Sequence, residues 1–91
     1  MPFSSLRDII EKFVQNPLIF SSYVCRIGEE NIKKTLRISD VRAVSFKQGK
    51  LYVIAPGSVI AMEIRMHEAR LLDAINQELG RKVVSKIVVK Q

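Results

Sequence analysis

The fold is decided by the stretch VRAVSFKQGKLYVIA, residues 41–55, in which apolar and polar side chains alternate on both sides of a turn dipeptide. Such alternation is typical of half-buried strands, and Gln48-Gly49 supplies a glycine where a tight hairpin needs a positive φ. The pattern predicts two antiparallel strands, residues 41–47 and 50–55. The side chains expected to face the core are Val44, Phe46, Leu51, Val53 and Ala55. Those expected on the opposite face are Ala43, Ser45, Lys47, Lys50, Tyr52 and Ile54.

Two helices are expected before this hairpin. The first begins at a serine cap, Ser4 or Ser5, and continues to Gln15, where Asn16-Pro17 ends it. The second covers residues 18–36. Gly28 lies inside it and costs ~1 kcal/mol relative to Ala, so we expect another element to approach the helix closely at this point.

One long helix and a third strand are expected after the hairpin. Ser58 is the expected N-cap, and Gly80 is expected to close the helix in the left-handed region. Residues 83–90 then read as a strand with Ile87 and Val89 inward. The expected core stripe of the helix consists of Ala61, Ile64, Leu71, Leu72, Ile75 and Leu79.

The element order is therefore α-α-β-β-α-β in a single domain, residues 1–91. This order predicts an α+β two-layer sandwich, in which helices cover one face of a three-stranded sheet and the other face stays open.

Charge and composition narrow the classes of function that the sequence allows. The net charge is +6, and it is concentrated in residues 31–60 (six basic, one acidic) and residues 81–91 (four basic, none acidic). One Cys excludes an intrachain disulfide, and one Cys with one His cannot supply four zinc ligands. The sequence contains neither a signal peptide nor an apolar run of ~20 residues. We therefore expect a cytoplasmic protein with no membrane partner.

The open sheet face is the candidate binding surface. Cations that can pair with phosphates surround an aromatic ring on which a base can stack, which favours single-stranded nucleic acid. The alternative is a solvated face whose lysines discourage pairing at the sheet edge. The candidate residues are Lys47, Lys50, Tyr52, Lys86 and Lys90, with Arg81 and Lys82 at the edge and Ile54, Val84 and Val88 between them.

Other residues give little indication of chemistry. Cys25 and His67 are a conceivable nucleophile–base pair, but Cys25 lies among apolar residues of a helix and is expected to be a packing residue. The glycines form neither a phosphate-binding loop nor a G-x-x-G clamp. We expect no enzyme, cofactor, metal or small-molecule substrate. Met62 and Met66 are interpreted either as core filling or as an adaptable apolar patch for a protein partner.

Five short blocks of the sequence carry a family resemblance, and they are Tyr23-Val-Cys-Arg-Ile-Gly28, Gly49-Lys-Leu-Tyr-Val53, Ala61-Met-Glu-Ile-Arg65, Leu71-Leu-Asp-Ala-Ile-Asn76-Gln-Glu-Leu-Gly80 and Val84-Ser-Lys-Ile-Val-Val89. Together these blocks resemble the DciA family domain, the bacterial partner and loader of the replicative helicase DnaB. The resemblance covers residues 18–89 and implies a KH-like α+β fold without ATPase activity. It also implies binding to a DnaB-type helicase and to single-stranded DNA. Tyr23 stands where the family usually has Trp, while Asn76 and Gly80 match a structural Asn and Gly at a helix end.

The expected function is therefore that of a DNA-replication accessory protein that binds single-stranded nucleic acid and the replicative helicase. Two alternatives stay open: a KH-like RNA-binding protein, and a pure protein-interaction module without a helicase role.

Overall fold

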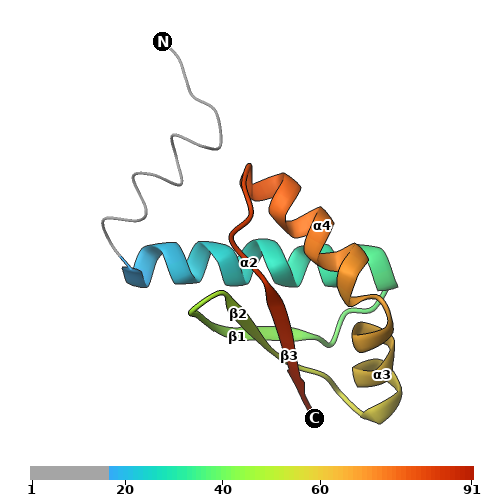
Figure 1. Ribbon diagram of the computed structural model, residues 1–91. Helices are drawn as coiled ribbons and strands as arrows, with labels where there is room; N and C mark the ends of the chain where they lie inside the picture. Colours follow the sequence, from blue (N-terminus) through green and yellow to red (C-terminus); the bar gives the residue numbers. More distant parts are fainter. Residues whose placement is uncertain (1–16) are drawn as a thin grey trace.

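The computed structural model describes residues 17–91 and shows three helices and a three-stranded sheet (Figure 1). The order α-β-β-α-α-β confirms the predicted α+β class and is consistent with a KH-like fold. The helix expected from Ser4 or Ser5 to Gln15 lies outside the described residues. The elements are α2 (Pro17–Leu36), β1 (Arg42–Lys47), β2 (Lys50–Ile54), α3 (Ser58–Met66), α4 (Glu68–Leu79) and β3 (Lys86–Lys90).

The sheet has the order β1-β2-β3, with β2 antiparallel to β1 and parallel to β3. The predicted hairpin is confirmed, and both turn residues, Gln48 (φ 55°) and Gly49 (φ 80°), have positive φ. Figure 1 shows α2 lying along the sheet, α4 running obliquely against α2, and α3 beside the end of the sheet opposite the hairpin turn.

A β-bulge in β1 overturns one predicted orientation. The register shifts between Ala43, which pairs with Val53, and Ser45, which pairs with Tyr52. Val44 has no partner across this bulge and is 52% exposed, although strict alternation predicted it in the core. Ala43, expected on the open face, packs against the core instead. An inserted residue reverses the facing of every strand residue before it.

The core lies between the inner face of the sheet and the helices. Leu51 in the central strand is fully buried, and its side chain meets the position that a Cβ on Gly28 would occupy. The expected close approach at Gly28 is therefore confirmed. Phe46 packs edge-to-face on Phe20, with ring centroids 6.0 Å apart. The other fully buried core residues include Val24, Ile32, Val53, Ala61, Ile64, Leu71, Ile75 and Leu79.

The single long helix expected after the hairpin is two helices, which meet at His67 (φ −105°, ψ 17°). Residues on both sides of the break bond to the free edge of β3. The Arg65 guanidinium donates to the Val89 carbonyl (3.3 Å), and the Glu68 carboxylate accepts from the Ile87 N–H (2.9 Å). No glycine or proline lies near His67, so the local sequence does not explain the break between the helices. The break coincides instead with the hydrogen bonds of Arg65 and Glu68 to β3. Gly57 occupies the cap position of α3 without a side-chain cap bond, so the prediction of Ser58 as N-cap is wrong.

The third strand begins at Lys86, three residues later than predicted. Val84, expected on the open face, is fully buried instead. The Asn76 side chain binds this backbone: its Oδ1 accepts from the N–H groups of Val83 and Val84, and its Nδ2 donates to the Val84 carbonyl, each at 2.9 Å. Gly80 closes α4 with φ 84°, as predicted.

Candidate nucleic-acid interface

The outer face of the sheet is built of three rows of side chains, because residues paired across strands point to the same side. The register places Lys47, Lys50 and Lys86 in one row, at the hairpin-turn end of the sheet. The middle row is Ser45, Tyr52 and Val88, and the far row is Arg42, Ile54 and Lys90.

The first row concentrates positive charge, and we call Lys47, Lys50 and Lys86 the lysine row. All three side chains are exposed. Adjacent strands lie about 4.8 Å apart, so the Cα atoms of the row lie within about 10 Å. None of the three strands contains Asp or Glu. Within residues 17–91 no carboxylate pairs with the lysine row or with Lys90. The lysine row is therefore free to attract anions, because no carboxylate among the described residues pairs with it.

Tyr52 lies at the centre of the face, between the lysine row and the far row. Its side chain is half-buried, with Ser45 on one side and Val88 on the other. Because Ser45 and Val88 are smaller than Tyr52, the outer side of the Tyr52 ring stays accessible. An aromatic ring flanked by cations is an arrangement that binds a base and its phosphates together.

Hydrogen bonds join the hairpin turn to the residues at the start of β3. The Gly49 carbonyl accepts from the Ser85 N–H (2.8 Å), the Ser85 hydroxyl (3.2 Å) and the Lys86 N–H (3.3 Å). A Cβ on Gly49 would lie 2.8 Å from the Ser85 Oγ. These contacts hold Lys86 beside Lys50 and so complete the lysine row.

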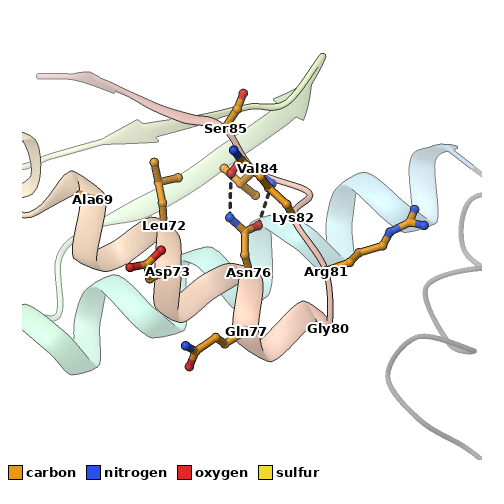
Figure 2. A pocket seen from close by; sticks show the side chains of 10 residues that line it. All are labelled: Ala69, Leu72, Asp73, Asn76, Gln77, Gly80, Arg81, Lys82, Val84 and Ser85. Atoms are coloured by element: carbon orange, nitrogen blue, oxygen red, sulfur yellow. Dashed lines mark hydrogen bonds between the residues drawn. The ribbon is translucent and has the colours of Figure 1, made fainter.

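Arg81 and Lys82 lie outside the sheet, in the segment that connects α4 to β3. They line a surface groove of ≈ 630 Å³ with Leu72, Asp73 and Asn76 among its other residues. Figure 2 shows the Asn76 side chain directed at the backbone of Val84, and the Arg81 side chain extending away from it. Ser85 lines the same groove and directly precedes Lys86, so the groove adjoins the lysine row.

The structure thus places Lys47, Lys50, Tyr52, Lys86 and Lys90 on one face, with Arg81 and Lys82 beside it. Sequence reasoning missed Arg42, which alternation without a bulge turns towards the core. An arginine at a core-facing position of a strand was the available signal for that bulge. The bulge places Arg42 in the far row, paired with Ile54.

Arg42 is partly balanced by Glu29 of α2. Burial alone would raise the pKa of Glu29, but the Ala43 N–H (2.8 Å), Lys33 (3.0 Å) and Arg42 together hold that pKa below its ordinary value. The lysine row has no such counter-charge among the described residues, so it is the stronger anion-binding part of the face.

The other candidates for chemistry do not form a site. Burial, and then the nearby Glu29 carboxylate, raise the pKa of the Cys25 thiol, which disfavours a thiolate nucleophile. His67 lies 3.6 Å from the Glu63 carboxylate. Residues 17–91 contain no group of three or more side chains suited to hold a metal ion, and none of their helices is long and apolar enough to cross a bilayer.

A comparison with models of protein families matches this chain to one family. The model of the family described as Dna[CI] antecedent, DciA, matches residues 38–89, which is more than half of the chain. The match includes the hairpin, α3, α4 and β3 as far as Val89, while the block Tyr23–Gly28 lies before it. Among curated proteins, none matches the chain.

Proposed function

This chain belongs to the DciA family, and on that premise we propose that it is a replication accessory protein that binds single-stranded nucleic acid and the replicative helicase. Membership implies a role related to loading of the DnaB-type helicase; the family is one of accessory proteins and not of known enzymes. The proposal places the protein in the cytoplasm. The observation that carries nucleic-acid binding is the lysine row beside Tyr52, on a face whose strands contain no carboxylate.

The chemistry of this face favours a single strand. Lys47, Lys50, Lys86 and Lys90 neutralise about four phosphates, which gives a slope of log K against log[salt] of about −3. Stacking of one base on Tyr52 contributes about 1–3 kcal/mol. A base inside a duplex is already stacked on its neighbours, so the Tyr52 contribution is specific to unpaired strands.

The direct test is a titration with single-stranded DNA, duplex DNA and RNA at two salt concentrations. A slope of about −3 weakens binding by about 60-fold between 50 and 200 mM salt. We expect single-stranded DNA to bind more tightly than duplex. A flat salt response would exclude the sheet face as the site, and tighter binding of RNA would favour the KH-like RNA-binding alternative.

Charge reversal locates the site. Lys86→Glu with Lys90→Glu removes two of the four phosphate contacts, and we expect the affinity for single-stranded DNA to fall at least tenfold and the salt slope to halve. The matched control is Arg26→Glu with Lys34→Glu, which changes the same charge at exposed positions of α2, on the side of the sheet away from the candidate face. Equal losses in both variants would show that only net charge matters.

A protein partner is the other use for the basic face. If a helicase binds the chain while single-stranded DNA and RNA do not, the face meets an acidic protein surface instead. Helicase binding by the Lys86→Glu, Lys90→Glu variant separates these cases, because nucleic-acid binding through the face predicts that helicase affinity is retained.

A further inference from the structure

Helix α3 is apolar on two opposite faces. Ala61 and Ile64 are fully buried against the core. On the other side, Val59, Met62 and Met66 are 69%, 55% and 67% exposed. At about 100° per residue these three side chains lie within about 60° of one another, directly opposite the core-facing pair. We call Val59, Met62 and Met66 the α3 stripe.

The α3 stripe is unusual among the described residues. Seven large apolar side chains of residues 17–91 are exposed, and three of them lie on this nine-residue helix. Single exposed apolar side chains are normal on protein surfaces, whereas a contiguous group indicates an interaction site. Methionine adapts its shape to a partner surface, which suits a docking role. The interpretation of Met62 and Met66 as core filling is therefore wrong.

Charge borders the α3 stripe on its β3 side. Arg65 of α3 is exposed, and its guanidinium donates to the Val89 carbonyl of β3 (3.3 Å). On the opposite border, Nε2 of His67 lies 3.6 Å from Oε1 of Glu63. The β3 border thus has one exposed cation, Arg65, and β3 itself contains no carboxylate.

We propose that the α3 stripe docks an amphipathic helix of a protein partner, whose apolar face covers Val59, Met62 and Met66 and which places a carboxylate against Arg65. Helices pack through ridges of side chains three and four residues apart, which is the spacing of Val59, Met62 and Met66. The inference rests on the proposed function in one respect: the partner tested is the replicative helicase.

The position of the stripe separates it from the lysine row. The lysine row lies at the hairpin-turn end of the sheet, whereas α3 follows the opposite end of β2 (Figure 1). Loss of the stripe should therefore affect the protein partner alone.

The experiment measures binding of the full chain to the purified DnaB-type helicase of the same organism and, in parallel, to single-stranded DNA. For Met62→Ser with Met66→Ser we expect helicase affinity to fall at least tenfold, with unchanged DNA affinity and thermal midpoint. Val59→Ser alone should weaken helicase binding by a smaller factor. Leu18→Ser on α2, at a residue that is 81% exposed, is the matched control and should bind as the wild type does. Arg65→Gln should weaken helicase binding mainly at low salt.

The outcomes separate the inference from the proposed function. If the wild-type chain binds helicase and the double methionine variant binds equally well, the α3 stripe is not the docking surface, while the proposed function stands. If the wild-type chain binds no helicase, the helicase part of the proposed function falls and the inference falls with it. If the variant loses DNA affinity as well, the stripe and the lysine row are not separate surfaces, and the inference is again overturned.

Discussion

At the scale of single residues, Asn76 shows how one side chain positions part of the candidate site. Its amide makes three hydrogen bonds to Val83 and Val84, and these hold the segment that leads into Lys86. The family resemblance indicated a structural role for Asn76 and Gly80, and the structure confirms it. The partners of Asn76 were not predictable, because a side-chain amide at a helix end can bond to its own helix or to the chain that follows.

We expect Asn76→Ala to lower the free energy of unfolding by about 2–4 kcal/mol, because two N–H groups and one carbonyl lose their partner in a part-buried place. Asn76→Asp keeps acceptors for both N–H groups and should cost less. Urea denaturation measures both values, with exposed Gln77→Ala on the same helix as the control. A loss for Asn76→Ala no larger than that of the control would contradict this role.

At the scale of elements, the sequence predicted what local periodicity determines and missed what tertiary contacts determine. The hairpin, α2 and the closure of α4 at Gly80 were predictable from alternation, helical spacing and glycines. The bulge at Val44 and the break at His67 were missed: neither has a glycine or proline, and the only signal for the bulge was Arg42 at a core-facing position. Both features lie where a backbone N–H of a strand donates to a carboxylate of a helix. Beside the bulge, the Ala43 N–H donates to Glu29 of α2, and beside the break, the Ile87 N–H donates to Glu68 of α4.

The bulge makes a testable difference at Val44. In the observed register Val44 is largely exposed, so Val44→Lys should change the free energy of unfolding by less than about 1 kcal/mol. The regular alternation that was expected would bury the ammonium and cost several kcal/mol. Val53→Lys, at a buried position of β2, is the comparison and should unfold the protein or cost at least about 3 kcal/mol. Thermal denaturation of the two variants distinguishes the registers, and similar large losses would mean that Val44 is in the core.

At the scale of the whole molecule, much of the net charge of +6 lies on the outer face of the sheet, and the sequence predicted this location in part. The two basic blocks meet because β3 runs parallel to β2, which brings Lys86 beside Lys50 and Lys90 beside Ile54. The neighbour of the third strand was not predictable from periodicity. Arg81 and Lys82 lie at the groove beside the face rather than on the face itself, because strand pairing begins only at Lys86.

The separation of the lysine row from the α3 stripe predicts a ternary complex. Single-stranded DNA on the outer face of the sheet and a helicase on the exposed side of α3 would contact different surfaces, so neither should displace the other. We expect saturating helicase to change the affinity of the chain for single-stranded DNA by less than about threefold, and we expect the effects of the lysine and methionine variants to add, as they do for distant sites. The measurement is fluorescence anisotropy with a labelled copy of this chain, titrated with an oligonucleotide too short to engage the helicase as well. Competition between the two ligands would place them on one surface, whereas additive losses in the combined variant would establish two independent sites on a chain of 91 residues.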